Sequence, residues 1–351
     1  MASLTLNDLS YTAEHFVSLL SHGRQLQAFT ELEHWRALLP LELRDALDRK
    51  IAWRLTRLAP RFLWPPMTWQ FDLTMSWRRE ETQRAITRIQ AAATQRPPMP
   101  ETAGLNRFQL YDIYSSIVET RGNAAAVSAL DANQRVIVGL RVETSTLANR
   151  GQGVYDDRLV VIAKGTDGGA PSVHEFTRAS TEPTAQYDGN QRNNSNVTFR
   201  RAEGVNISGN HEPEPGRLAE GTIEMLETTH PNPRRAGTNF SLRPTSDAVR
   251  NGADGVQRDT NHDGYFNDAD VGGRVSLNNT FKIHSGSMNN TDSAGCQTLH
   301  PDDFAAFREA VSADSAQARW YYVLTETRPR TFSEWRVPMR LDPATPSLGM
   351  R

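Results

Sequence analysis

The sequence of 351 residues predicts an α+β protein, in which an N-terminal helical domain precedes a mostly β domain with long loops. Up to about residue 96, apolar residues recur at helical spacing. Short runs rich in β-branched and aromatic residues follow, separated by stretches of Gly, Asn, Asp, Ser and Pro. The prolines of residues 97–104 suit a linker, since closely spaced prolines favour extended chain. We therefore expect a helical module in residues 1–96 and a second domain in residues 105–351, a division that the chain length favours.

Three amphipathic helices are expected before Pro60. Thr12 can cap the first of them, and Gly23 is placed to end it. The second stops at Pro40 and the third before Pro60, because proline cannot continue a helix. Their apolar stripes are Phe16, Leu19 and Leu20, then Leu26, Phe29, Leu32 and Trp35, and then Leu43, Leu47, Ile51, Leu55 and Leu58.

Five of the seven tryptophans fall in this helical region. One interpretation is that the large rings fill the core of a helical bundle. The other is a docking surface for a protein partner, because tryptophan is enriched in binding hot spots. The five are Trp35, Trp53, Trp64, Trp69 and Trp77.

The second domain is expected to open with one helix, which carries Phe108, Tyr111, Tyr114 and Val118 and ends near Gly122. Six β-type runs follow. Helices do not alternate with them, so the pattern differs from a repeating βαβ fold. The runs are residues 136–142, 159–163, 197–200, 221–226, 281–284 and 320–324.

The composition excludes some classes of function. A net charge of -2 argues against a nucleic-acid binder that relies on phosphate contacts. Only Lys50, Lys164 and Lys282 of the 39 basic residues are lysines, which reflects either a GC-rich genome or arginines that grip carboxylates. The N-terminus lacks the features of a signal peptide, and no apolar run approaches the roughly 20 residues of a membrane helix. We expect a protein made in the cytoplasm, with no transmembrane segment, no nucleic-acid partner and no organic cofactor.

Cys296 is the only cysteine, so it cannot form an internal disulfide. A lone thiol is a buried filler, a redox-sensitive group or a nucleophile. A nucleophilic thiol needs a base and donors aimed at the developing oxyanion. His284 lies at the end of an expected strand, and the small residues Ser293, Ala294 and Gly295 form a turn that can present the thiol with its backbone amides exposed. These neighbours favour the nucleophile.

The residues around this thiol resemble the active-site block of the L,D-transpeptidase (YkuD-type) family of peptidoglycan enzymes. The block consists of Ile283-His284-Ser285-Gly286, then Ser293-x-Gly295-Cys296, a helix from Pro301 and the strand Trp320-Tyr321-Tyr322-Val323-Leu324. Upstream, Leu218-Ala219-Glu220-Gly221-Thr222-Ile223 is similar to the Thr-Pro-x-Gly-Thr-Phe strand of the family. Residues 296–301 resemble divergent members from phages and secreted bacterial antagonists. The similarity covers residues 218–325 and, more loosely, everything from about residue 105.

The resemblance implies a YkuD-like catalytic domain in which Cys296 is the acyl-accepting nucleophile and His284 its general base. It implies that the backbone carbonyl of Ser285 holds the other imidazole nitrogen. Amides near Gly295 and Cys296 would form the oxyanion hole.

Substrate binding is expected from Gly286 and Ser293, and from Arg141 through its guanidinium. Most family members have histidine where this chain has Ala294, and this departure puts the acceptor side of the site in doubt.

The expected function is cleavage of peptidoglycan stem peptides at an L,D bond through a thioester on Cys296. Water would make the protein an L,D-carboxypeptidase or endopeptidase; an amine acceptor would make it a transpeptidase that forms cross-links or exchanges D-amino acids. The same residues would also suit a catalytically silent wall-binding or structural module of an injection machine, or acyl transfer on a non-wall substrate. The absence of a signal peptide favours an antibacterial component that a phage tail or type VI-like secretion machinery delivers to the cell wall or periplasm.

A second motif, residues 259–270, fits the calcium-loop pattern D-x-[DN]-x-[DN]-G, in which oxygen ligands stand at positions 1, 3, 5, 7 and 9. The twelfth position holds a shorter aspartate in place of glutamate. The alternative is a metal-free turn rich in Asx and Gly residues. If it binds Ca²⁺, the ion would be structural and would brace the strand of His284. The expected ligands are Asp259, Asn261, Asp263, the carbonyl of Tyr265, Asn267 and Asp270.

Overall fold

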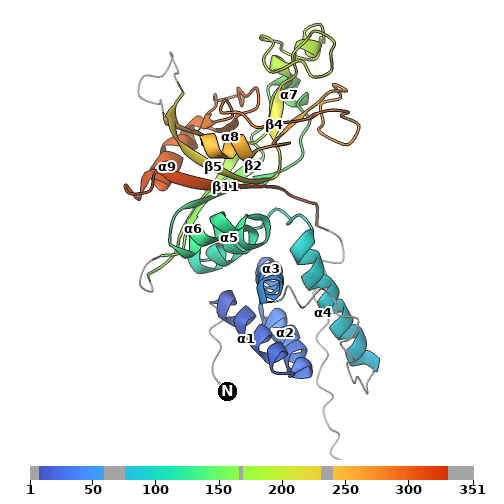
Figure 1. Cartoon of the computed structure of the whole chain (residues 1–351), viewed down its shortest axis with the longest axis vertical. Helices are drawn as coiled ribbons and strands as arrows, with labels where there is room; N and C mark the ends of the chain where they lie inside the picture. Colours follow the sequence, from blue (N-terminus) through green and yellow to red (C-terminus); the bar gives the residue numbers. More distant parts are fainter. Residues whose placement is uncertain (1–7, 59–75, 166–168, 231–239, 331–351) are drawn as a thin grey trace, which may run out of the picture.

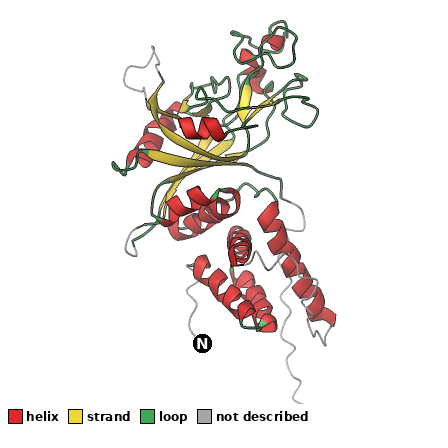
Figure 2. Ribbon diagram, viewed as in Figure 1, coloured by secondary structure: helices red, strands yellow, loops and turns green. Residues whose placement is uncertain are grey.

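The computed structural model describes residues 8–58, 76–165, 169–230 and 240–330. It contains both helices and strands (Figure 2), and most of the helical residues precede the strands along the chain. The α+β class is therefore confirmed. The helices are α1 (Leu9–Ser21), α2 (Gln25–Leu38), α3 (Leu41–Leu58), α4 (Ser76–Thr94), α5 (Arg107–Arg121), α6 (Ala124–Asp131), α7 (Ala148–Gly151), α8 (Ser246–Asn251) and α9 (Pro301–Ser312), with 3-10 turns η1 (Ala185–Tyr187) and η2 (Gly189–Gln191).

The first three helices agree with the expected ones, except for the start of α1. The Asp8 side chain accepts a hydrogen bond from the backbone N–H of Tyr11, and Thr12 lies inside the helix. The prediction that Thr12 caps α1 is therefore wrong, because Asp8 supplies a preferred capping carboxylate one turn earlier. Gly23 follows the helix end with a φ of 73°, a conformation that costs glycine little.

One hydrophobic cluster extends from the N-terminal helices to the sheet. It includes Phe16 of α1, Trp35 of α2 and Val138 of strand β1 (Val136–Arg141), all buried. Figure 1 shows α5 and α6 next to the sheet and α1 to α4 farther from it. The buried Lys50 of α3 also donates a hydrogen bond of 2.9 Å to Ser115 of α5. Apolar and polar contacts therefore connect the helices that precede residues 97–104 with the part of the chain that follows them. The domain boundary at residues 97–104 stays a prediction.

Two of the five tryptophans can be placed by their side chains. Trp35 is buried in the core, and Trp53 is half-buried with the Arg57 guanidinium 4.6 Å from its ring centroid. Trp64 and Trp69 lie outside the described residues, as does the side chain of Trp77. The docking surface on these rings therefore stays a prediction.

Eight strands form a closed barrel in the order β1-β11-β5-β6-β9-β10-β3-β2, and three short strands form a separate sheet in the order β4-β7-β8. Alternate residues of a strand point to opposite faces, so Val138 and Leu140 of β1 face the helices while Ile137 packs in a second cluster with Phe307 of α9. The strands are β1 (Val136–Arg141), β2 (Asp157–Ala163), β3 (Ser172–Ser180), β4 (Gly216–Leu218), β5 (Gly221–Thr229), β6 (Phe240–Pro244), β7 (Val256–Arg258), β8 (Arg274–Val275), β9 (Ile283–Ser285), β10 (Gln297–Leu299) and β11 (Arg319–Glu326).

Five of the six expected β runs coincide with or overlap strands, and one is wrong. Residues 197–200 form a loop, in which Thr198 N–H donates to the Arg150 carbonyl and Arg200 N–H to the Gln186 carbonyl. Both amides donate to carbonyls that lie outside the strands. The β propensity of these residues does not produce a strand here, because no neighbouring strand in the described part of the chain pairs with them.

The described ranges contain no helix that is long and apolar enough to cross a membrane.

Candidate active site

The barrel places the two predicted catalytic residues on, or immediately before, two neighbouring parallel strands. His284 lies in the middle of β9, where it pairs with Thr298 of β10. Cys296 immediately precedes β10, and the adjacent Gln297 N–H donates to the Lys282 carbonyl across the pair at 2.7 Å. The histidine and the cysteine therefore lie near each other although a loop separates them in sequence.

The imidazole of His284 is held by the carbonyl that the family resemblance names. Its Nδ1 lies 2.8 Å from the backbone oxygen of Ser285. A carbonyl oxygen can only accept, so Nδ1 carries the hydrogen and Nε2 keeps the lone pair. Burial, followed by the effect of the neighbouring His230, lowers the pKa of His284 to about 4. At neutral pH His284 is thus an uncharged base with Nε2 as its basic nitrogen.

The thiol of Cys296 is half-buried and donates to the Thr280 carbonyl at 3.6 Å. Loss of hydration raises its pKa to about 11, although the backbone N–H and the charge of Lys282 act in the opposite direction. Within the described residues, no hydrogen bond joins this sulfur to the His284 ring. The resting pair is therefore a neutral thiol beside a neutral imidazole. The raised pKa of the thiol and the lowered pKa of the imidazole both disfavour a thiolate–imidazolium ion pair.

The turn before the thiol is fixed by its own side chains. Ser293 Oγ donates to the Cys296 carbonyl at 2.7 Å and accepts from the Gly295 N–H at 2.9 Å. Gly295 has a φ of 139°, and a Cβ there would lie 2.2 Å from the Gly216 carbonyl, so only glycine fits. The Gly295 amide is thus occupied, whereas the structure assigns the Cys296 amide no partner among the described residues. Of the expected oxyanion donors, the Cys296 amide is the available one.

Gly286 and Ser293 lie close to the site, but both are buried and make contacts within the protein. A Cβ on Gly286 would lie 2.1 Å from the hydroxyl of Tyr155, which in turn donates to the Ser287 carbonyl at 2.8 Å. These contacts shape the loop from β9 to the thiol. Substrate binding by the two residues stays a prediction.

A cavity of about 380 Å³ lies beside this loop. Its charged lining residues, Arg200 and Asp292, form an ion pair, and the Tyr187 hydroxyl bonds to the same aspartate. Asp292 also acts electrostatically on His284. The cavity therefore offers polar groups to a ligand, and one of its lining residues influences the imidazole. Its lining is Gln152, Gln186, Thr198, Phe199, Arg200, Ser287, Asn290 and Asp292.

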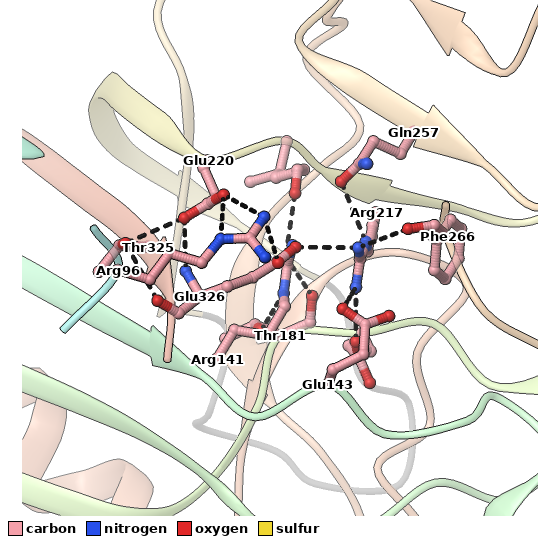
Figure 3. Close-up of polar contacts among 12 residues, drawn as sticks. Arg96, Arg141, Glu143, Thr181, Arg217, Glu220, Gln257, Phe266, Thr325 and Glu326 are labelled. Atoms are coloured by element: carbon pink, nitrogen blue, oxygen red, sulfur yellow. Dashed lines mark hydrogen bonds and ion pairs between the residues drawn. The ribbon is translucent and has the colours of Figure 1, made fainter. Parts of the chain in front are cut away.

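Arg141 belongs to a different part of the molecule, a buried charge cluster at the end of the barrel (Figure 3). Its side chain is 0% exposed and donates to Thr181 Oγ1 at 2.8 Å and to the Leu218 carbonyl at 2.9 Å. The structure does not bring it to His284 and Cys296, so its predicted grip on a substrate carboxylate has no support here.

Arg217 is the centre of that cluster and is 1% exposed. It bonds to Glu182 at 2.7 Å, to Glu143 at 3.0 Å and to Glu326 at 2.9 Å, and its guanidinium lies 4.5 Å from the ring centroid of Phe266. Figure 3 shows the labelled members of this set converging on the guanidinium. The cluster therefore connects β4 to Glu326, the last residue of β11. Gly295, in the turn before the thiol, packs against Gly216 of the same strand β4.

The predicted calcium loop forms a tight turn whose side chains accept from its own backbone. Asp259 Oδ2 accepts from the Gly264 N–H at 2.8 Å, and Asp270 Oδ1 accepts from the Thr260 N–H at 2.7 Å. Burial raises the pKa of Asp259 to about 6, and the nearby Asp270 and Asp263 contribute to the increase. In the part of the chain that the structure describes, no group of three or more His, Cys, Asp or Glu side chains is arranged to hold a metal ion. The carboxylates are near one another but do not converge on one point.

Sequence patterns missed three residues that shape the site. His230 stacks on the His284 ring, Gln297 donates to the Gly295 carbonyl at 3.2 Å, and Tyr322 donates to Gln297 at 3.1 Å. Gln297 follows the cysteine directly, and this adjacency was the available signal. His230 lies far from His284 in sequence and belongs to no recognisable motif. It reaches the site because β5 pairs with β6 and β6 pairs with β9.

The buried, neutral His284 should make the protein sensitive to acid. The folded pKa of about 4 lies below the ordinary 6.5, so its contribution is complete above pH 6.5 and is lost as the pH falls toward 4. Between these values the free energy of unfolding should fall by about 3 kcal/mol more in the wild type than in His284→Gln. Urea unfolding of both proteins at a series of pH values measures this difference. Parallel curves would contradict it.

Comparisons with models of protein families, with curated proteins and with solved structures give no match.

Proposed function

We propose that the protein is a cysteine-dependent peptidoglycan enzyme that cleaves stem peptides at an L,D bond. The observation that carries the proposal is the hydrogen bond from His284 Nδ1 to the Ser285 carbonyl, which leaves Nε2 as a base on the strand beside the thiol. The residues that make this arrangement are the ones that resemble the L,D-transpeptidase block. A YkuD-like catalytic domain behind an N-terminal helical domain is part of the same proposal.

In the proposed reaction, Cys296 Sγ attacks the carbonyl of the third stem residue while His284 Nε2 takes the thiol proton. The tetrahedral oxyanion lies against the Cys296 amide. Collapse expels the terminal D-alanine, whose amine takes the proton from His284, and leaves a thioester on Cys296. Water then attacks the thioester with His284 again as the base, which releases the shortened peptide and restores the thiol.

Cleavage is favoured over cross-linking because Ala294 replaces the usual family histidine and contributes no titratable group next to the thiol. An amine acceptor in place of water would give a transpeptidase. We infer delivery to the cell wall by a phage tail or secretion machinery from the resemblance of residues 296–301 to members from phages and secreted bacterial antagonists.

A catalytically silent wall-binding module is the second candidate, and one observation favours it. The thiol has a raised pKa and bonds to a backbone carbonyl rather than to the imidazole. A Cys296 that fails to react with iodoacetamide in the native protein would support this second candidate.

Mass spectrometry of muropeptides separates these functions. The wild type and Cys296→Ala are incubated with purified peptidoglycan that carries tetrapeptide stems. Cleavage predicts tripeptide stems and free D-alanine with the wild type only. New cross-links or exchanged D-amino acids would indicate a transpeptidase, and an unchanged pattern with folded wild type would reject the wall enzyme.

Calcium binding to residues 259–270 is proposed as a structural brace. The loop supplies the hard oxygen donors that Ca²⁺ prefers, and a cation would offset the mutual repulsion that contributes to the raised pKa of Asp259. Binding requires the carboxylates of Asp259, Asp263 and Asp270 to turn toward a common point.

Calcium should therefore raise the melting temperature. At a hundredfold excess over Kd, binding stabilises a protein by about 2.7 kcal/mol, which corresponds to roughly 4 °C for a chain of this size. Scanning calorimetry with Ca²⁺, with Mg²⁺ and with chelator measures the shift, and Asp263→Asn should abolish it. A melting curve that does not change in excess chelator would refute the calcium site.

A further inference from the structure

His230 lies directly against the proposed base. It follows β5, and its ring stacks on that of His284 with centroids 4.1 Å apart and planes 19° from parallel. Lys282 Nζ donates to the Thr229 carbonyl at 3.1 Å, which ties the end of β5 to the strand of His284. This hydrogen bond helps to hold the two rings side by side.

Two contacts restrain the His284 ring in different directions. The hydrogen bond to the Ser285 carbonyl lies in the ring plane, and the His230 ring covers one face. Rotation about the Cβ–Cγ bond would break the first contact and open the second. His230 is half-buried, so it also replaces water that would otherwise reach that face.

We propose that His230 is a positioning residue, which holds the imidazole of His284 in one plane and shields one of its faces from water. The proposal rests on the role of His284 as the base in the proposed function. His230 itself transfers no proton in it.

Two neighbours of His284 lower its pKa, as the exclusion of water does. After burial, His230 is the largest cause of the lowered pKa of His284, and Lys282 adds to it. Asp292 acts in the opposite direction on both rings, and Glu203 does so on His230. His230 also has a lowered pKa because of its burial. Protonation of both stacked imidazoles at once is disfavoured, since the two cations would lie about 4 Å apart.

The test compares His230→Ala with His230→Phe, which keeps an aromatic face but has no ring nitrogen. The exposed His174 of β3 provides the matched control, His174→Ala. Imidazole ¹⁵N NMR of the full chain reports the pKa and the tautomer of His284 without any substrate. Steady-state kinetics on a tetrapeptide muropeptide reports kcat and KM.

In His230→Ala the pKa of His284 should rise by about one unit, because water reaches the ring and a neighbouring imidazole is lost. The Nδ1-protonated tautomer should become less populated. His174→Ala should keep the wild-type values. His230→Phe should keep the wild-type tautomer, and its His284 pKa should rise less than in His230→Ala, because the aromatic face still excludes water although the electrostatic effect of the imidazole is lost. The kcat of His230→Ala should fall about 10- to 100-fold with KM within about twofold, and phenylalanine should restore most of it.

An unchanged pKa and tautomer of His284 in His230→Ala would overturn the proposal, and so would a phenylalanine variant that behaves like the alanine variant. If the wild type does not process muropeptides at all, the proposed function fails. The NMR titration still decides the role of His230 in that case, so the two failures are distinguishable.

Discussion

Replacing Cys296 by alanine should lower the rate of stem-peptide cleavage by about 10⁴-fold or more, because the covalent route is lost with its nucleophile. The side chain is half-buried and small, so the change leaves the packing of the barrel almost intact. KM should change little, because the thiol contributes to the transition state more than to ground-state binding. Release of D-alanine from a tetrapeptide muropeptide, measured with purified protein, gives the rate.

Two further variants make this result specific. Cys296→Ser keeps the shape but has a poorer nucleophile and should also be inactive. His174→Ala, on the outside of β3, should cleave at the wild-type rate. If Cys296→Ala keeps more than about a tenth of the wild-type rate, the activity belongs to another residue.

The second large effect concerns stability. Arg217→Met should lower the free energy of unfolding by about 3 to 5 kcal/mol, because it removes a buried guanidinium to which two buried carboxylates bond. Glu182 and Glu326 both bond to this guanidinium and are 6% and 4% exposed. Burial raises the pKa of Glu182 while Arg141 and Arg217 lower it, so this carboxylate would bind a proton more readily once Arg217 is absent. Urea unfolding at pH 7.5 measures the loss.

The control is Arg192→Met, which removes a guanidinium that is 52% exposed and pairs with Glu212 at the surface. It should cost at most about 1 kcal/mol. Adding Glu182→Gln and Glu326→Gln to Arg217→Met should recover part of the loss, since the two buried negative charges that bonded to Arg217 are then absent. A loss below about 1 kcal/mol for Arg217→Met alone would show that the cluster does not stabilise the fold.

Local patterns predicted the elements whose signals are strong and self-contained. The stripes of α2 and α3, and the apolar runs of β1, β2 and β11, are long and periodic, so the structure confirms them. The helix α6 was missed because it starts at once after α5, capped by Asn123. Strand β3 was missed because charged and polar residues alternate along its outer face. The barrel itself follows from pairings between distant strands, which no local pattern contains.

The same distinction applies to the site. Cys296, His284 and the Ser285 carbonyl lie within thirteen residues of one another, and their motif could be read from the sequence. Arg141 could not be assigned from its residue type, because a guanidinium grips a substrate or a buried carboxylate equally well and only its burial decides. His230 reaches the site through two intervening strand pairings, so its role needed the fold.

The central claim is that a stem peptide acylates Cys296. Intact-protein mass spectrometry after rapid mixing with a tetrapeptide muropeptide, followed by acid quenching and peptide mapping, tests it most directly. We predict a mass increase equal to the muropeptide acyl group without its terminal D-alanine. The adduct should map to Cys296, be removed by hydroxylamine and be absent in Cys296→Ala. Release of D-alanine by the wild type with no adduct on Cys296, or with an adduct on another residue, would contradict the claim.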